Sequence, residues 1–158
     1  GPANNHGIAD VCQELATARR RPPHTKERRW EMAMGLVLSV LPETLTVCRL
    51  APDADLPAWV MAGGFWSITR TPEELSIAVA KNLVPPGVRA EGTWRALKVA
   101  GPTPLSAVGI LTSLAVPLAR AGISVFAIST FDTDYLLVGT DRLEDACVAL
   151  SEAGHTIC

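Results

Sequence analysis

Two acidic side chains, Asp132 and Asp134, stand in a short run between two β-type segments, where they are well placed to bind a cation. A carboxylate that accepts a hydrogen bond from an ammonium or guanidinium group contributes about 1.5–3 kcal/mol net. The same run, from Phe131 to Asp134, also has ordinary turn chemistry, because Asp hydrogen-bonds its own backbone and tolerates unusual dihedral angles. The residue types alone leave both interpretations open.

A complementary feature is the start of a predicted helix over residues 106–121, where Gly109 lies close to the first turn. Backbone N–H groups at the start of a helix lack partners and carry partial positive charge, so they suit a carboxylate. A glycine there lets a ligand approach the main chain without a Cβ in the way. A helix start of this kind would suit an anionic group of a ligand, and the acidic turn would suit a cationic one.

Catalytic chemistry is poorly supported. Ser129 and Thr130 could offer a hydroxyl nucleophile, but the only histidine after residue 31 is His155, near the end of the chain. A Ser–His–acid triad is therefore not expected. The cysteines lack the paired spacing of a zinc site or a disulfide framework; they are Cys12, Cys48, Cys147 and Cys158. The sequence predicts no enzyme, no catalytic residue, no metal site and no cofactor.

Composition and charge narrow the classes of partner. Hydrophobic residues make up 48% of the 158 residues, enough for a core. Residues 1–31 hold 6 of the 14 basic side chains, whereas residues 32–158 hold 8 basic and 12 acidic ones, a net charge of −4. An acidic body argues against nucleic acid as the main partner. No apolar run reaches the length of a membrane span and no segment resembles a signal peptide, so we expect a cytoplasmic location.

The second half of the chain has the clearer pattern of elements. Gly122 and Gly154 follow amphipathic segments as helix terminators. Between them, strand-like and helix-like runs alternate in the order β-α-β-β-α-β, which is the ferredoxin-like split βαβ pattern. The predicted elements are a strand at Trp94–Ala100, a helix at Ser106–Ala121, strands at Ile123–Thr130 and Tyr135–Gly139, a helix at Leu143–Ala153, and an edge strand at His155–Cys158.

The first half gives the same order with a shortened second helix at Lys81–Val84. Strands are predicted at Leu36–Leu41, Thr44–Leu50, Phe65–Arg70 and Leu75–Ala80, and a short helix, capped by Asp53 or Asp55, at Asp53–Ala62. The expected organisation is a disordered or cloning-derived tail at 1–34, with one short helix at Asp10–Arg21, a first unit at 35–92 and a second unit at 93–158. The predicted fold class is α+β, with antiparallel sheets and helices on one face.

Three runs carry a resemblance to a known family: residues 66–76, 94–99 and 121–135. They resemble the bacterial proteins with two ACT domains, which are similar to each half of the CASTOR arginine sensors. The resemblance covers about Thr44 to Thr156. Its most specific part is the run Ile-Ser-Thr-Phe-x-x-Asp, which follows Ala-Gly-Ile-Ser and ends at Asp134.

The resemblance implies two ACT units and non-catalytic binding of a free amino acid between units, often across a dimer interface. In the sensor relatives the ligand is held by the turn and by backbone near the start of the preceding helix. A homodimer is expected, since a small split βαβ unit leaves an open sheet edge. A downstream protein partner would bind differently to the free and the ligand-bound states. The implied ligand-binding residues are Val108, Gly109, Ile110, Ser129, Thr130, Phe131, Asp132, Thr133 and Asp134.

Two other functions stay open at this point. The chain could be the detached regulatory subunit of an amino-acid-metabolising enzyme. It could also be an adaptor that binds another protein through its sheet surfaces and has no ligand. Thermal stabilisation by an amino acid would favour binding, whereas conversion of the amino acid would favour catalysis, and no response to any amino acid would favour the adaptor.

Overall fold

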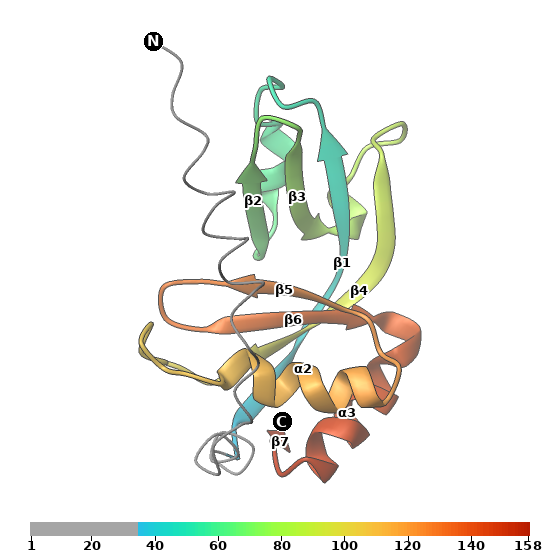
Figure 1. Cartoon of the computed structure of the whole chain (residues 1–158). Helices are drawn as coiled ribbons and strands as arrows, with labels where there is room; N and C mark the ends of the chain where they lie inside the picture. Colours follow the sequence, from blue (N-terminus) through green and yellow to red (C-terminus); the bar gives the residue numbers. More distant parts are fainter. Residues whose placement is uncertain (1–34) are drawn as a thin grey trace, which may run out of the picture.

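The computed structural model describes residues 35–158, and the predicted tail at 1–34 with its helix at Asp10–Arg21 lies outside this range. Figure 1 shows the arrangement of strands and helices. The strands are β1 (Val37–Leu50), β2 (Trp66–Arg70), β3 (Leu75–Ala80), β4 (Ala90–Val99), β5 (Val125–Ser129), β6 (Asp134–Gly139) and β7 (Thr156–Ile157). The helices are α2 (Ile110–Arg120) and α3 (Leu143–Glu152), with 3₁₀ turns η2 (Ala58–Ala62), η3 (Lys81–Leu83) and η4 (Thr140–Arg142).

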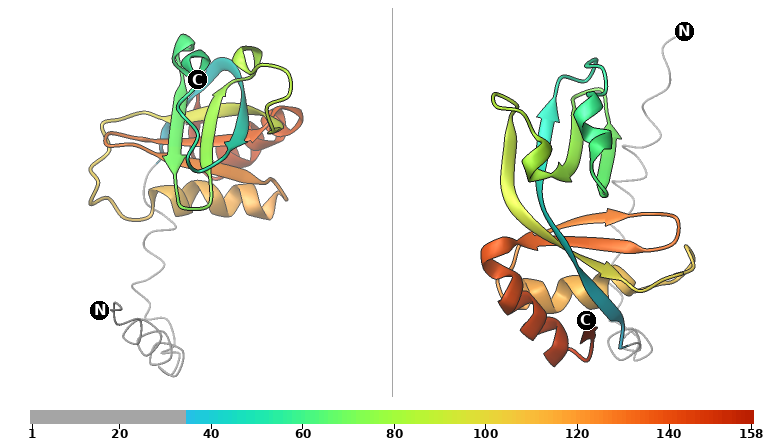
Figure 2. Two further views of the ribbon diagram at one scale, coloured as in Figure 1. Left: turned by 90° about the horizontal axis from the view of Figure 1, so that it is seen from above. Right: turned by 180° about the vertical axis from the view of Figure 1, so that it is seen from behind.

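The described strands form one seven-stranded sheet in the order β2-β3-β1-β4-β6-β5, with β7 paired to β1. All pairs are antiparallel except β1 with β7. The long strands β1 and β4 pair from Leu38 with Val99 to Cys48 with Ala90, so both run through the two halves of the molecule (Figure 2). The α+β fold class with an antiparallel sheet is confirmed.

Both α-helices belong to one half of the molecule, where they lie side by side beneath β5 and β6 (Figure 1). The buried residues of α2 are Ile110, Leu114 and Leu118, spaced by four, so they fall on one helix face. They pack with apolar residues of the sheet and of α3, namely Leu38, Leu97, Leu136, Val138, Ala146 and Leu150. The other half is built around a smaller cluster beneath η2 and η3, formed by Cys48, Val60, Leu75, Ile77 and Val79.

The first half differs from the sequence prediction in its strands. Leu36–Leu41 and Thr44–Leu50 were expected to be separate, but β1 is continuous through Pro42. The pairing of β1 with β4 shifts register between Val40 and Thr44. Such an irregularity tolerates a proline, which cannot donate to the strand ladder, so the chain bends here without ending the strand.

The predicted helix at Asp53–Ala62 is also corrected: only the 3₁₀ turn Ala58–Ala62 forms. Pro57 stands at its N-cap position and no side chain caps it, so Asp53 and Asp55 are not helix caps. A proline has no N–H and favours the extended conformation of the residue before it, which confines helical structure to the residues that follow. The first half therefore contributes 3₁₀ turns rather than α-helices within the described chain.

The division into units at 35–92 and 93–158 stays a prediction. Strand β1 pairs with β3 of the first half along Leu45–Leu50 and with β7 at Val37–Leu38. Strand β4 pairs with β6 from Trp94 to Lys98. Each long strand thus serves both halves, and neither half has a sheet made only of its own residues.

His155 ties three segments together near the end of the chain. Its buried ring accepts a hydrogen bond at Nδ1 from the Leu36 N–H, at 3.2 Å, and its Nε2 lies 3.2 Å from the carbonyl oxygen of Ser113. Because Nδ1 accepts, Nε2 carries the proton and donates. The histidine therefore joins the residue before β1, helix α2 and the segment that leads into β7.

We expect His155→Ala to lower the free energy of unfolding by about 2 kcal/mol, because it leaves the Leu36 N–H and the Ser113 carbonyl without this partner. Urea unfolding measures the change. Thr156→Ala, at the next and exposed position, is the control and should change stability by less than about 0.5 kcal/mol. Equal stability of wild type and His155→Ala would contradict the role given to the ring.

Candidate functional site

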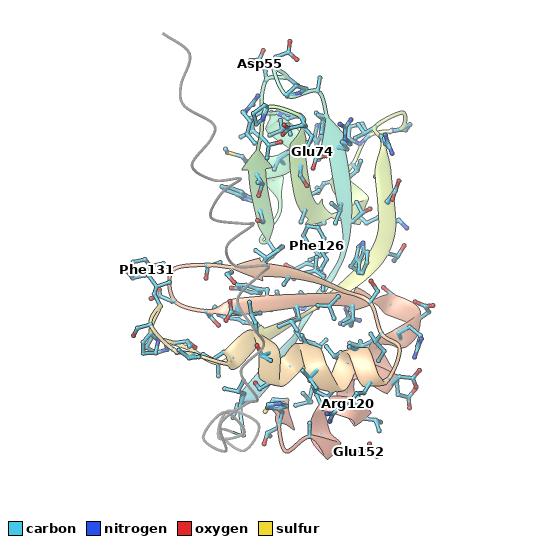
Figure 3. All side chains as sticks on the ribbon, in the orientation of Figure 1. Asp55, Glu74, Arg120, Phe126, Phe131 and Glu152 are labelled. Carbon is cyan, nitrogen blue, oxygen red and sulfur yellow. The ribbon has the colours of Figure 1, made fainter. Side chains whose placement is uncertain are left out.

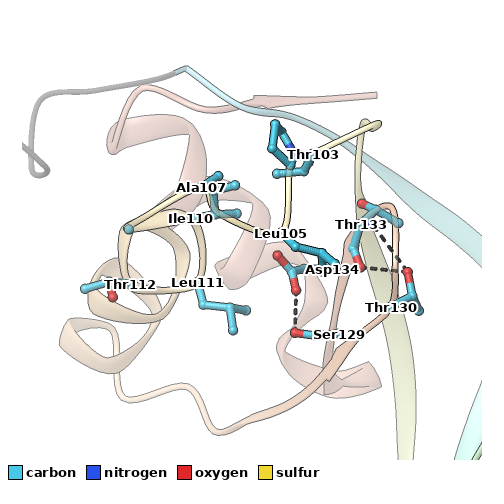
Figure 4. A pocket seen from close by; sticks show the side chains of 12 residues that line it. Thr103, Leu105, Ala107, Ile110, Leu111, Thr112, Ser129, Thr130, Thr133 and Asp134 are labelled. Carbon is cyan, nitrogen blue, oxygen red and sulfur yellow. Dashed lines mark hydrogen bonds between the residues drawn. The ribbon is translucent and has the colours of Figure 1, made fainter.

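A pocket of about 350 Å³ lies between the start of α2 and the β5–β6 hairpin (Figure 4). Its volume is at the small end of the range of about 300–1,000 Å³ that ligand pockets usually have. Two separate segments of the chain, the helix start and the acidic turn, meet here. Six of the nine predicted ligand-binding residues line it: Gly109, Ile110, Ser129, Thr130, Thr133 and Asp134.

The helix side of the pocket is defined by Gly109. Its φ of 90° is in the left-handed region, which favours glycine, and α2 begins at the following residue, Ile110. The predicted start at Ser106 is therefore four residues too early, since a residue with positive φ interrupts a right-handed helix. No side chain caps α2 and its first turn holds no acidic residue, so this end presents backbone N–H groups and partial positive charge.

The opposite side of the pocket carries the Asp134 carboxylate. Asp134 is the first residue of β6 and stands directly across from Ser129 of β5. The Ser129 hydroxyl donates to Asp134 Oδ1 at 2.5 Å, which fixes the direction of the carboxylate (Figure 4). Within the described chain Oδ2 accepts no hydrogen bond, so one carboxylate oxygen of Asp134 is left to accept from a ligand.

Thr130 and Thr133 build the turn between these strands. The Thr130 N–H donates to the Thr133 carbonyl oxygen at 2.8 Å, and the Thr130 hydroxyl donates to the same oxygen at 2.8 Å. The buried Thr133 hydroxyl donates to the Val99 carbonyl oxygen at 2.5 Å, which attaches the turn to β4. Both hydroxyls therefore hold the turn in place, and Asp134 follows it in a fixed position.

Asp132 contributes its backbone rather than its carboxylate. Its carbonyl oxygen accepts from the Thr103 N–H at 2.7 Å, and a Cβ on Gly101 would lie only 2.8 Å from that oxygen. The contact seats the 101–109 segment against the turn. The Asp132 side chain is exposed and does not line the pocket, nor do Val108 and Phe131, which are 90% and 79% exposed.

The structure adds six lining residues that were not predicted. Four of them lie in the 101–109 segment that precedes α2. The other two lie on the first turn of α2, and their position directly after Gly109 in a predicted helix could have indicated them. The six are Thr103, Pro104, Leu105, Ala107, Leu111 and Thr112.

The described residues give little support to nucleophilic or metal chemistry. Burial raises the pKa of the Cys48 thiol, and burial together with Glu144 raises the pKa of the Cys147 thiol, whereas a reactive thiolate needs a lowered pKa. Both ring nitrogens of His155 are in hydrogen bonds to backbone. Within residues 35–158, no three His, Cys, Asp or Glu side chains are grouped to hold a metal ion, and neither α-helix has the length and apolar character of a membrane span.

Comparison with known proteins agrees with this architecture. The family model of the ACT domain matches residues 89–152, and a second model, of an N-terminal domain, matches residues 43–86. A solved protein of Agrobacterium tumefaciens is 39% identical, with a TM-score of 0.75, and the match covers 80% of this chain and 94% of that one. The regulatory subunit of aspartate kinase from Thermus thermophilus shares the fold alone, at 15% identity and a TM-score of 0.52, covering 72% of this chain and 96% of that one.

Among curated proteins, the cytosolic arginine sensor for mTORC1 subunit 1 of Bos taurus is 38% identical over 104 residues, 59% of this chain and 30% of that protein. The chain spans about half or less of the length of the curated relatives it matches. The two family models together reach from β1 to α3, and the pocket lies within the part that the ACT model matches. Residues 89–152, which include the pocket, therefore form a domain of the ACT family.

Proposed function

We propose that this chain is a non-catalytic regulatory module that binds a free amino acid in the pocket between α2 and the β5–β6 hairpin. The observation that carries the proposal is that the uncapped start of α2 and the Asp134 carboxylate line one small pocket. The ACT domain at residues 89–152 and similarity to a protein named as an arginine sensor support an amino acid as the ligand.

The two ends of the pocket match the two charges of an amino acid. The backbone N–H groups that begin α2 suit the α-carboxylate, and Gly109 exposes the main chain there. The free oxygen of Asp134 suits the α-ammonium group. A ligand that bridges them would hold the helix and the hairpin in one arrangement, which a protein partner could then recognise.

A thermal-shift screen of the full chain against the twenty amino acids tests the proposal. A ligand at a hundred times its Kd stabilises the folded state by about 2.7 kcal/mol, which raises Tm measurably. We expect at least one amino acid to raise Tm and to remain unchanged after incubation with the protein. If no amino acid shifts Tm, the chain acts as an adaptor without this ligand.

We also propose that the protein is a homodimer joined through β5. This strand is one of the two edges of the described sheet, and its sequence Val-Phe-Ala-Ile-Ser contains no charged residue, whereas the other edge, β2, ends in Arg70. Long uncharged edges promote pairing with another chain unless they are covered. Phe126 on β5 and Phe131 at the tip of the hairpin are both exposed (Figure 3). Pairing of two β5 strands would cover this edge beside the pocket.

Ala127→Lys should convert the dimer to a monomer, because a charged side chain at the middle of β5 opposes edge pairing. Light scattering after size-exclusion chromatography measures the mass. Val148→Lys, on the exposed face of α3, is the matched control and should leave the dimer intact. A wild-type protein that is monomeric at all concentrations would refute the proposed interface.

The bovine relative is named as cytosolic, and we propose a cytoplasmic location for this chain as well. A small amino-acid-binding dimer can act only through the proteins that distinguish its free and bound states. The ligand must therefore change the affinity for a downstream partner, by the same factor as the partner changes the affinity for the ligand.

A further inference from the structure

The lining of the pocket carries a single formal charge, that of Asp134. Every other lining residue is apolar, glycine, or a hydroxyl-bearing Ser or Thr. The start of α2 adds the partial positive charge of its backbone N–H groups. The pocket therefore offers one acceptor for a cation and one region for an anion.

The cation acceptor and the helix start are both occupied by the α-ammonium and α-carboxylate groups that all amino acids share. The α-ammonium group takes the free oxygen of Asp134, and the α-carboxylate takes the helix start. Nothing in the lining is left to neutralise a charge on the side chain of the ligand. On the basis of the function proposed above, we propose that the ligand is a neutral amino acid with an apolar side chain.

The remaining walls favour an apolar side chain. Leu105 and Leu111 line the same pocket as Asp134 and are 72% and 37% exposed (Figure 4). Ala107 and Ile110 add further apolar surface. A ligand side chain that covers the two leucines removes apolar area from water on both surfaces, at about 25 cal/mol per Å².

A cationic side chain, as in arginine or lysine, finds no second carboxylate in the lining to pair with. The nearest candidate in the sequence, Asp132, is exposed and outside the lining, and its carbonyl oxygen already accepts from the Thr103 N–H. If two β5 strands pair antiparallel about Ala127, Ser129 stands opposite Val125 of the second copy, which adds an uncharged residue beside the pocket.

Calorimetry with matched ligands tests this inference on the full chain. Norleucine and methionine should bind at least about tenfold more tightly than lysine, a difference of 1.4 kcal/mol. Arginine should bind at least about tenfold more weakly than methionine. Tighter binding of lysine or arginine than of norleucine would overturn the inference while leaving the proposed function intact. Absence of binding by these four and by every amino acid of the thermal-shift screen would overturn the proposed function itself.

A charge-adding variant checks that the pocket lining sets this preference. Leu105→Asp places a second carboxylate in the lining, at an exposed position of the 101–109 segment where the fold tolerates it. The affinity ratio of lysine to norleucine should rise by about tenfold relative to wild type. An unchanged ratio would show that the side chain of the ligand does not meet this wall, and would overturn the inference.

Discussion

Replacing Asp134 by asparagine is expected to weaken amino-acid binding by about 10- to 150-fold, with little change in the fold. The substitution keeps the shape of the side chain and removes its negative charge, so the α-ammonium group loses a charge-assisted hydrogen bond of about 1.5–3 kcal/mol. The asparagine side-chain oxygen can still accept from the Ser129 hydroxyl, which keeps the hairpin in place. Calorimetry with the best amino acid of the thermal-shift screen measures the loss.

Asp132→Asn is the matched control for this prediction. It removes the same charge two residues earlier on the same turn, from an exposed side chain that does not line the pocket. Its affinity should stay within about twofold of wild type, since an exposed charge at this distance is largely screened by solvent and salt. If the two variants lose affinity equally, the loss reflects the net charge of the turn and the specific role of Asp134 is wrong.

Leu114→Ala should give the largest loss of stability, about 2–5 kcal/mol. Leu114 is fully buried at the centre of α2, in the core that joins this helix to β1, β4, β6 and α3. Truncation removes the transfer free energy of the side chain and leaves a cavity that the surrounding strands fill only in part. Urea unfolding measures the change, and ligand binding should weaken as well, because α2 carries one wall of the pocket.

Leu111→Ala makes the same substitution one turn earlier on the same helix, at a residue that is partly exposed and lines the pocket. It should cost less than about 1 kcal/mol of stability, since little buried area is lost. The substitution should instead weaken ligand binding. Similar losses of stability for the two variants would mean that α2 is not seated through its 110–114–118 face.

The opposite outcomes expected at Leu114 and Leu111 follow from a pattern that is visible in the sequence. Apolar residues recur at intervals of three and four through 110–120, which predicts an amphipathic helix, and Gly122 predicts its end. Gly122 indeed has a φ of 67°. Strand β3 has the predicted bounds, Leu75–Ala80, directly after the predicted turn. Local rules suffice here because each residue's preference agrees with its place in the fold.

The start of α2 shows where local rules fail. The predicted helix includes residues 106–109, but Gly109 adopts a positive φ and the chain before it folds against the hairpin through the Thr103 N–H and the Asp132 carbonyl oxygen. That contact is between residues far apart in the sequence, and no periodic pattern of residue types predicts it. The same holds for β1, where pairing with β3 and β4 outweighs the break that Pro42 predicts.

The sequence by itself therefore determined the order of the elements in the second half, the acidic turn and the glycine beside a helix start. These depend on interactions between near neighbours, which residue type controls. Only the tertiary structure decided that Asp134 rather than Asp132 lines the pocket, and that Leu105 and Leu111 form its apolar wall. Which side of a turn faces a helix is set by strand pairing and core packing over the whole chain, and these depend on all the contacting residues together.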